Sequence, residues 1–532
     1  MSDVESLSML FSTVPAEQMG TVMSAFAEEH STEERAAVVE DLLRACGENW
    51  RQQAGSWIAD LLSVEKLVPE AFANWRPLVH ECMAFVASHM SDARLAPKIV
   101  EQIELPPETP EEVRLGLVIA KTPGLQKLGQ VLARARRLSP ALRHELQKLE
   151  NGISDVTPGE VHEIVLRQLT QSLDANDVQL APALLCEASV SAILEFTWMN
   201  PATGKREPGV FKVMKPHVPV CFSEDLRLLQ DLAEHLTSRR REYLFASREV
   251  IETLDEVRLL LAREVDFRRE QATLAEVGRV YKRAGWRAPR PIPELSTDTI
   301  TALSFERGVK VTDACRAQPL IRRHIASQII EAIIASPMFS SEENAVFHAD
   351  PHAGNMLYDE ANREVVVLDW ALTGRLSRDD RRQLARLMIM MTLRDSAGVR
   401  SAIHALSRST AGDDGTNTAI IDRCVTEYFD ELPFACSLGA LDAMRLLDRI
   451  GVEGVRFSGS LVLIRKVMFT LDGVLHDITG GTVRIDTIVT REFLSRWLKK
   501  VGALPGPFTV ADYLAVQRSA LMYVTGLWSL DA

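Results

Sequence analysis

The chain lacks several features that mark common classes of protein. Its seven cysteines form no C-x-x-C pair, and such an odd count favours neither a disulfide framework nor a structural zinc site. No run of about eighteen uncharged apolar residues is present, so no transmembrane helix is predicted. The first thirty residues carry four glutamates and no basic flank before an apolar stretch, which predicts no signal peptide. We therefore expect a cytoplasmic protein with at most peripheral membrane contact.

Positive charge is not in excess either. The formal net charge is −13 at pH 7, from 60 basic and 73 acidic residues, whereas nonspecific nucleic-acid binding depends on basic patches. Nucleic acid is therefore not an expected partner. The composition, with 46% apolar and 25% charged residues, is typical of soluble globular proteins. At 532 residues the chain is too long for one hydrophobic core, so two or more packed units are predicted.

Local sequence patterns divide the chain into five regions. Helical periodicity dominates up to a proline-rich break near 105–112, gives way to short β-rich runs after about 180, and later returns around one strand pair. The sequence shows no internal repeat at solenoid spacing. The order of the elements predicts a two-lobed, mostly helical α+β protein. The regions are a helical N-terminal region at 1–110, a helical extension at 111–180, a lobe with a small β-sheet at 181–310, a helical lobe at 311–490 and a C-terminal helical tail at 491–532.

Two strand pairs are predicted within these lobes. Residues 193–198 and 209–214 flank the turn-rich segment 200–204, which is typical of an antiparallel hairpin. Residues 356–358 and 365–368 form a second pair around a polar turn. Ser31 and Glu34 have the spacing of a capping box, which predicts a helix start in the N-terminal region. A further strand is predicted at 299–305.

The strongest chemical signal is the segment Phe-His-Ala-Asp-Pro-His-Ala-Gly-Asn at 347–355. Asp350 precedes Asn355 by five residues and Asp369 by nineteen, and Asp369 follows the hydrophobic strand at 365–368. Phosphoryl transfer from ATP needs oxygen ligands for magnesium and a carboxylate that orients or deprotonates the nucleophile. Protein kinases space these groups similarly. We therefore predict Asp350 as the catalytic residue, Asn355 and Asp369 as metal ligands, and ATP and Mg²⁺ as cofactors.

The phosphates of a nucleotide also require a cation upstream of this segment. Lys212 lies in the strand candidate 209–214, and Glu270 is the best helical carboxylate to hold it. The order of these elements, with matching secondary structure, predicts a nucleotide site more strongly than any one of them. The end of the strand candidate 299–305 and the residues after it are also predicted to contact nucleotide: Ser304, Phe305, Glu306 and Arg307.

These motifs resemble the UbiB/AarF family of atypical kinase-like ATPases, across about 120 to 480. Lys127-Leu-Gly-Gln130 matches the K-x-G-Q motif of that family, and Glu264-Val-Asp266 matches its E-x-D helix. The resemblance implies a two-lobed protein-kinase-like core with a helical extension whose K-x-G-Q segment covers the protein-substrate site. It also implies that Lys127 contacts Glu264 and that Lys212 pairs with Glu270. The implied gating motif is Lys127, Gly129, Gln130, Glu264 and Asp266.

The resemblance further implies what such a protein does. The family is associated with ATP hydrolysis more firmly than with phosphorylation of other proteins, and it is linked to ubiquinone and other isoprenoid-lipid metabolism. The expected partners are ATP, a lipid or prenyl-phenol compound, and biosynthetic enzymes that bind through the N-terminal helices. A phosphate-covering loop is implied at 186–189, with Ala188 and Ser189 as nucleotide contacts.

This sequence departs from the family pattern at three places near the predicted site. The phosphate-covering loop is rich in alanine in the family but contains Glu187 here, which brings a like charge toward phosphates unless it points away. Asp369 is followed by Trp370 and Ala371 instead of phenylalanine and glycine. Ala353 replaces the usual proline. The lysine and metal positions are all retained.

Three other readings of the same residues stay open. His348, Asp350 and His352 could form the zinc site of a metallohydrolase, although no further His or Cys cluster accompanies them and Pro351 interrupts a shared helix. The chain could instead be a noncatalytic scaffold that binds nucleotide. A small-molecule kinase shares the catalytic segment but has no K-x-G-Q extension.

Overall fold

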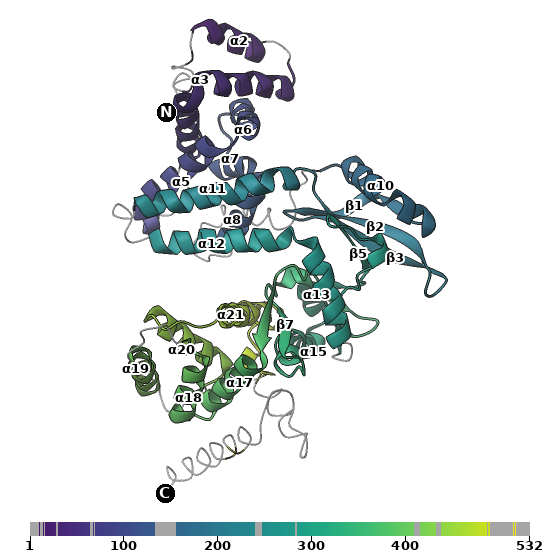
Figure 1. Cartoon of the computed structure of the whole chain (residues 1–532), viewed down its shortest axis with the longest axis vertical. Coiled ribbons are helices and arrows are strands. Elements are labelled where there is room, and N and C mark those ends of the chain that lie inside the picture. The colour runs from purple at the N-terminus through teal and green to yellow at the C-terminus, as the bar shows by residue number, and fades with distance from the viewer. Residues whose placement is uncertain are drawn as a thin grey trace. The chain divides into compact units, whose positions relative to one another are not determined.

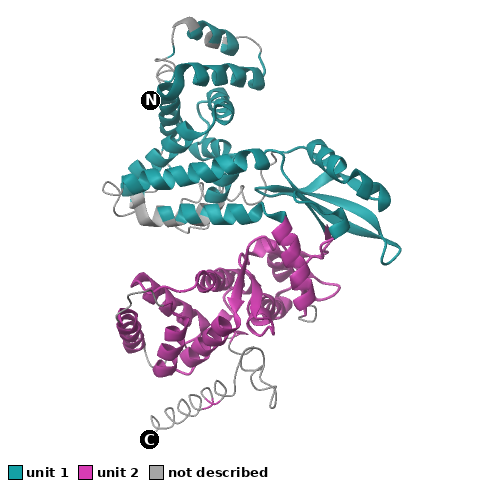
Figure 2. Cartoon of the chain, in the orientation of Figure 1, with its two compact units in different colours: residues 1–267, 293–302 teal, residues 268–292, 303–532 magenta. Residues whose placement is uncertain are grey.

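The structure is a computed structural model, in which the chain forms two compact units (Figures 1 and 2). Unit 1 comprises Met1–Phe267 and Pro293–Ala302, and unit 2 comprises Arg268–Ile292 and Leu303–Ala532. The predicted C-terminal tail at 491–532 lies outside the described residues, apart from 514 and 517. The structure describes residues 10, 14, 16–27, 30–63, 67–68, 70–133, 156–239, 247–281, 285–408, 415–431, 438–486, 488–489, 514 and 517.

The first part of unit 1 is helical, as the sequence predicts. The capping box at Ser31 is present, because its hydroxyl accepts from the Glu34 amide at 3.2 Å and the Glu34 carboxylate accepts from the Ser31 amide at 2.8 Å. The helices and one 3₁₀ turn are α2 (Ala16–Ala27), α3 (Thr32–Leu61), η1 (Glu70–Trp75), α5 (Arg76–His89), α6 (Asp92–Glu104), α7 (Glu111–Ile119) and α8 (Pro123–Ala133).

Two longer helices of unit 1, α11 (Val218–Ser238) and α12 (Ser247–Glu264), pack against α8 (Figure 1). Leucines of α11, including Leu228, Leu229 and Leu232, join the buried core of the N-terminal helices. The N-terminal helical region and the helices that follow the sheet therefore share one hydrophobic core.

Unit 1 also contains a four-stranded sheet in the order β1-β2-β3-β5. The strands are β1 (Gln179–Glu187), β2 (Ser191–Asn200), β3 (Lys205–Met214) and β5 (Ile300–Ser304), with helix α10 (Pro158–Ala175) and the 3₁₀ turn η2 (Pro293–Leu295) nearby. The predicted hairpin is confirmed, because β2 pairs antiparallel with β3 over its whole length. Phe196 stacks on Phe211, and a Cβ at the facing Gly209 would meet the Phe196 ring at 2.4 Å, so this strand position requires glycine.

Unit 2 contains short strands and many helices. The predicted strand pair is confirmed as β8 (Met356–Asp359) against β9 (Glu364–Val367), which belong to a sheet in the order β4-β9-β8-β6. A second sheet pairs β7 (Asn344–His348) with β10 (Thr373–Ser377). The other elements before the catalytic segment are α13 (Phe267–Val280), β4 (Trp286–Arg287), β6 (Val309–Lys310), α14 (Val311–Ala317), η3 (Pro319–Ile321), α15 (Arg322–Ile330), the π-helical turn η4 (Glu331–Ala335) and α16 (Ser336–Met338).

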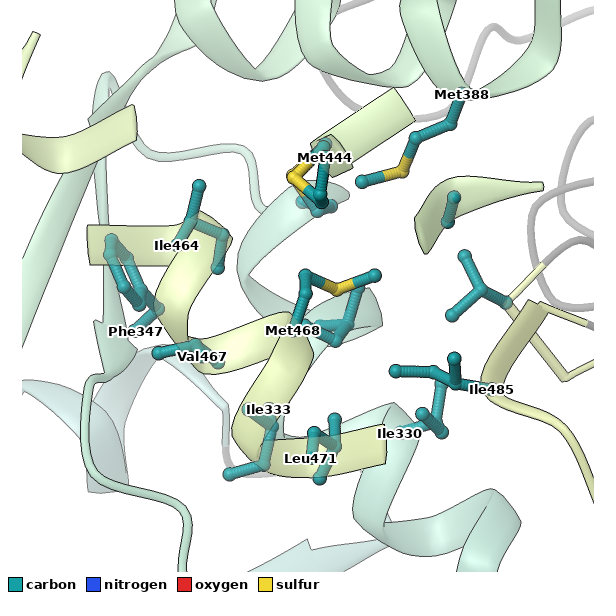
Figure 3. Close-up of a cluster of buried hydrophobic side chains, with 14 of the residues drawn as sticks. Ile330, Ile333, Phe347, Met388, Met444, Ile464, Val467, Met468, Leu471 and Ile485 are labelled. Atoms are coloured by element: carbon teal, nitrogen blue, oxygen red, sulfur yellow. The ribbon is translucent and has the colours of Figure 1, made fainter. Parts of the chain in front are cut away.

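The rest of unit 2 packs around one hydrophobic core. Figure 3 shows side chains from several helices meeting there, among them Met388, Met444 and Met468. Phe347, which immediately precedes His348, lies in the same core and anchors the start of the predicted catalytic segment. The elements are η5 (Ala353–Asn355), α17 (Arg378–Thr392), α18 (Ser396–Leu406), α19 (Thr416–Glu431), α20 (Ala440–Val452) and α21 (Gly459–Thr479).

These elements confirm the predicted class, a mostly helical α+β protein. Among the helices that the structure describes, none is long and apolar enough to cross a membrane.

Candidate active site

His348 connects the predicted catalytic segment to the residues around Asp369. The Asp350 amide donates to its Nδ1 at 3.2 Å, and its Nε2 lies 3.0 Å and 2.8 Å from the carbonyl oxygens of Leu368 and Asp369. Because Nδ1 accepts, Nε2 must carry the proton, which makes the imidazole neutral. Its complete burial lowers the pKa of His348 and favours this neutral form. The ring therefore fixes the backbone of Asp350 beside that of Asp369.

Asn355 and Asp369 are held beside each other by the backbone. The Asn355 side-chain amide donates to the Asp350 carbonyl at 3.2 Å, and the Leu368 amide donates to the Asn355 carbonyl at 2.8 Å. Asp369 has a φ of 50°, a left-handed conformation that aspartate tolerates better than most residues, and its carboxylate accepts from the Ala371 amide at 3.4 Å. The donor set suits magnesium, because amide and carboxylate oxygens are the ligands that this ion prefers.

Trp370 belongs to the core of unit 2. Its side chain is 1% exposed, and its indole nitrogen donates to the Val367 carbonyl at 3.0 Å. The ring stacks on Trp286 with centroids 5.9 Å apart and meets the His348 ring edge-on at 5.1 Å. The residue that replaces the usual phenylalanine therefore packs against the histidine that orients Asp369.

In unit 1, Lys127 of the K-x-G-Q motif forms an ion pair with Glu264 of the E-x-D motif. This is the contact that the resemblance implies. The Ser189 hydroxyl donates to the other oxygen of Glu264 at 3.3 Å, so the phosphate-covering loop meets both motifs. Both members of the ion pair are largely buried. The rest of the predicted gating motif comprises buried Gly129, exposed Asp266, and Gln130, whose side chain lies outside the described part of the structure.

A second ion pair holds the other end of the phosphate-covering loop. The Glu187 carboxylate lies 3.0 Å from the Lys215 ammonium, with the two side chains 7% and 1% exposed. The backbone closes the same turn, because the Ala188 amide donates to Ser191 and the Lys215 amide donates to Val190, at 2.7 and 3.0 Å. The negative charge of Glu187 is thus paired with a lysine of its own unit.

The sequence analysis missed Lys215, whose side chain pairs with Glu187 of the predicted phosphate-covering loop. The signal was present, because a buried Glu187 needs a nearby cation, and Lys215 stands directly after the strand that carries Lys212. Lys212 itself is buried on β3, and its ammonium lies 5.6 Å from the centroid of the Phe267 ring. Glu270 is buried on α13 of unit 2, so its pairing with Lys212 stays a prediction.

Comparison with known proteins identifies the domain that carries most of these motifs. Residues 156–403 match the family model described as the ABC1 atypical kinase-like domain. The chain contains an ABC1 atypical kinase-like domain. This confirms the resemblance drawn from the motifs, and it implies a protein-kinase-like fold for the matched residues. Lys127 and the N-terminal helices lie outside the match.

Two known proteins show the extent of the likeness. The chain is 24% identical over 370 residues to Protein ACTIVITY OF BC1 COMPLEX KINASE 7, chloroplastic, of Arabidopsis thaliana. The match covers 67% of this chain, which spans about half (50%) of that relative's length. A solved structure, the complex of Rv3197 with erythromycin from Mycobacterium tuberculosis, is similar with a TM-score of 0.39 and 12% identity, covering 60% of this chain and 84% of that one.

Two residues of the ABC1 domain that were predicted to bind nucleotide have side chains held by the protein. The Ser304 hydroxyl accepts from the Arg290 amide at 2.9 Å and donates to Glu306 at 2.7 Å. Arg287 holds the other oxygen of Glu306 at 2.7 Å. Both side chains thus have partners within the protein, and the contact of these two residues with a nucleotide stays a prediction. The other two predicted contacts lie beside them: half-buried Phe305 and exposed Arg307.

The two histidines of the predicted catalytic segment act as structural residues of the loop. His348 uses both ring nitrogens in hydrogen bonds to backbone groups, which leaves neither as a zinc ligand. The Nδ1 of His352 accepts from the Gly354 amide at 3.1 Å, and its Nε2 lies 3.7 Å from the Asp350 carboxylate. Within the described ranges, no group of three or more His, Cys, Asp or Glu residues could hold a metal ion. These contacts argue against the metallohydrolase reading.

Proposed function

We propose that this protein is an ATP-binding, magnesium-dependent atypical kinase-like enzyme whose main reaction is the slow hydrolysis of ATP. The observation that carries the proposal is the position of His348, which holds the backbone of Asp350 against that of Asp369. A carboxylate for the nucleophile and a carboxylate for a cation are thereby fixed on adjacent segments. The match of residues 156–403 to the ABC1 atypical kinase-like domain supports the same reading.

The proposed roles follow from the chemistry of each residue. Asp350 orients the attacking hydroxyl or water and accepts its proton. Asn355 and Asp369 would hold Mg²⁺, which neutralises the charge of the phosphates when bound. Lys212 supplies a second positive charge, and Ala188 and Ser189 lie in the loop that would cover the phosphates. Because these are electrostatic and positioning roles, each should be sensitive to a change of charge at constant size.

Water is the proposed acceptor because of the contacts of Lys127. Its ion pair with Glu264 and the bond from Ser189 to Glu264 hold the K-x-G-Q helix beside the phosphate-covering loop within unit 1. A helix in that place supports restricted access for a protein substrate, whereas water needs little space.

The cellular role is proposed from the family resemblance alone. We propose a role in quinone or isoprenoid-lipid metabolism, with a lipid or prenyl-phenol compound as the small-molecule partner and biosynthetic enzymes recruited through the N-terminal helices. We also propose a cytoplasmic protein with peripheral membrane contact. Salt or carbonate washing should then release it from membranes, and retention in the membrane fraction until detergent is added would contradict this.

Phosphate release from the purified protein with magnesium and ATP tests the proposal. The wild type should release phosphate slowly, and prenyl-phenol compounds or anionic liposomes should change the rate. Asp350→Asn and Asp369→Asn should abolish release, whereas Asp313→Asn, which removes an exposed carboxylate of α14, should leave it unchanged. Release that persists in Asp350→Asn would overturn the catalytic role. Nucleotide binding without release in the wild type would favour the noncatalytic scaffold.

A further inference from the structure

The helix that carries the K-x-G-Q motif starts at a buried carboxylate. The first residue of α8 is Pro123, which has no amide hydrogen, so Gly124 has the first amide of the helix that needs a partner. That amide donates to Oδ2 of Asp225 at 2.6 Å, and Asp225 is 1% exposed. A carboxylate at this end of a helix also interacts favourably with the helix dipole.

The contact between Gly124 and Asp225 leaves little room for a side chain at position 124. A Cβ at Gly124 would meet the Cβ and Oδ2 of Asp225 at 3.1 and 3.2 Å, which is tighter than most real contacts. Alanine at this position would therefore push the Asp225 carboxylate away from the amide. Glycine permits the close approach of helix and carboxylate.

The other oxygen of Asp225 binds the N-terminal helical region. Arg94 on α6 donates to it at 2.6 Å, and a second nitrogen of Arg94 lies 3.2 Å from Glu224. Glu224 in turn accepts from the amide and the hydroxyl of Ser91, at 2.8 and 3.0 Å. Burial raises the pKa of Asp225, and Arg94 opposes that rise. Arg94 therefore favours the charged form of the carboxylate where it meets α8.

These contacts run without interruption to the phosphate-covering loop. They lead from Arg94 to Asp225, from Asp225 to the first turn of α8, and from Lys127 one turn later to Glu264. One helical turn is about 5.4 Å of stiff backbone, so fixing Gly124 also fixes Lys127. Figure 1 shows α8 between α11 and α12, the helices that carry Asp225 and Glu264. All these residues belong to unit 1.

We propose that Asp225, held by Arg94, is the positioning residue of the K-x-G-Q helix. Through this contact the N-terminal helical region would help to hold the gating motif in place. Arg94 and Gly124 lie outside the match to the ABC1 domain, so this control is added to the kinase-like core by the rest of the chain. The proposal rests on the proposed function for its effect on phosphate transfer, but its structural step is independent of activity.

Hydrogen exchange of the full-length protein, followed by mass spectrometry, tests the structural step. Asp225→Leu should speed exchange of the amides at the start of α8 by about 10- to 100-fold, because a hydrogen bond to a charged acceptor is lost. Asp225→Asn keeps an oxygen for Gly124 but loses the charge for Arg94, so its effect should be smaller. Arg94→Met should resemble Asp225→Asn, and Arg94→Lys should restore most of the protection.

The control is Arg35→Met, which breaks the Arg35–Glu104 ion pair between α3 and α6 in the same region without touching α8. It should leave exchange at α8 unchanged. Gly124→Ala is the milder second variant, in case Asp225→Leu does not fold, and it should speed exchange in the same amides. Unchanged protection of α8 in folded Arg94→Met and Gly124→Ala proteins would overturn the proposal.

Labelled phosphate from ATP provides the second readout. If Asp225 only stabilised the fold, its loss would lower hydrolysis and self-phosphorylation together. A released α8 should instead raise the ratio of self-phosphorylation to hydrolysis several-fold, with Arg94→Lys returning it toward the wild-type value. A fall of both rates in proportion would overturn the gating step. Absence of turnover in the wild type would contradict the proposed function and leave the hydrogen-exchange result to decide the role of Asp225.

Discussion

Glu187 and Lys215 form an almost completely buried ion pair at the loop that would cover the phosphates of a nucleotide, with 3.0 Å between carboxylate and ammonium. Glu187 ends strand β1 and Lys215 directly follows strand β3. The pair therefore joins two strands that are not neighbours in the sheet, whose order is β1-β2-β3-β5. It explains how a glutamate is accommodated in a loop that is otherwise rich in alanine in the family.

Removal of one partner of this pair should destabilise unit 1 strongly. Lys215→Met leaves a buried carboxylate without its cation, which typically reduces the unfolding free energy by about 3–5 kcal/mol. The double variant Glu187→Leu with Lys215→Met should recover most of that loss, because neither charge remains buried. Urea unfolding followed by tryptophan fluorescence measures both.

Arg206→Met, which breaks the more exposed Arg206–Asp177 pair at the same sheet, should change stability by at most about 1 kcal/mol. If Lys215→Met and Arg206→Met reduced the unfolding free energy equally, the buried pair would contribute no more to stability than the exposed one.

Magnesium and ATP together should raise the melting temperature of the wild type. A ligand that binds only the folded state stabilises it by about 2.7 kcal/mol at a hundred times its Kd. Asp369→Asn should weaken magnesium-dependent binding by more than the roughly 10- to 100-fold typical of outer-shell changes, because it removes a charged ligand. Differential scanning fluorimetry with ATP, with magnesium, and with both separates these effects. A wild-type melting curve that saturating magnesium–ATP leaves in place would contradict the nucleotide site.

Much of unit 2 could be predicted from the sequence because its chemistry is local. The strand pair β8–β9 and the nearby loop place Asp350, Asn355 and Asp369 within a short stretch of chain, and strand alternation and turn residues indicate such a pair directly. The capping box at Ser31 is equally local. The sequence also indicated the order of the lysine, the helical carboxylate and the residues predicted to bind metal. The ABC1 match bears out the family to which that order pointed.

Contacts between distant segments could not be predicted in the same way. Gly124 and Asp225 are 101 residues apart, and nothing in either helix pattern indicates which amide a buried aspartate will meet. The sequence left open whether Trp370 faces a nucleotide or the core. Its burial and its stacking on Trp286 place it in the core, and Trp286 lies on β4, which is distant in the sequence. The sequence did not indicate that Arg287 would bind the side chain of Glu306, and the contact of Glu306 with a nucleotide stays a prediction. Such choices depend on the packing of whole elements.

A carboxylate cluster around Arg287 should make the stability of unit 2 depend on pH in acid. Hydrogen bonds from Arg287 and Asn362 lower the pKa of Asp359 from its ordinary 3.8 to about 2. The unfolded chain therefore binds this proton more readily than the folded chain, so the contribution of Asp359 is complete above about pH 4 and is lost as the pH falls through about 2. Asp359→Asn removes that titration. Its difference from wild type in unfolding free energy should be largest near neutral pH and should shrink toward pH 2.

Urea unfolding at several pH values between 7 and 3 measures this difference. Asp255→Asn removes a mostly exposed carboxylate and should change stability little at neutral pH. A difference between wild type and Asp359→Asn that stays constant from neutral pH to pH 3 would show that the contact with Arg287 contributes no pH-dependent stability.

The contact between Lys127 and Glu264 should determine where the phosphoryl group goes. If α8 restricts the site, a protein hydroxyl cannot come within the roughly 3 Å that general-base catalysis by Asp350 requires. Lys127→Ala removes the cation that holds Glu264, and Ala188→Gly frees backbone angles in the phosphate-covering loop. Together they should shift the protein from hydrolysis toward self-phosphorylation, measured as labelled phosphate bound to the chain.

Lys121→Ala, which removes an exposed lysine just before α8, should behave as wild type. Asp350→Asn should abolish both hydrolysis and self-phosphorylation, alone or combined with the other substitutions. Strong transfer to generic protein substrates by the unmodified protein would mean that the K-x-G-Q helix does not restrict the site, and the gating role of Lys127 and Glu264 would be wrong.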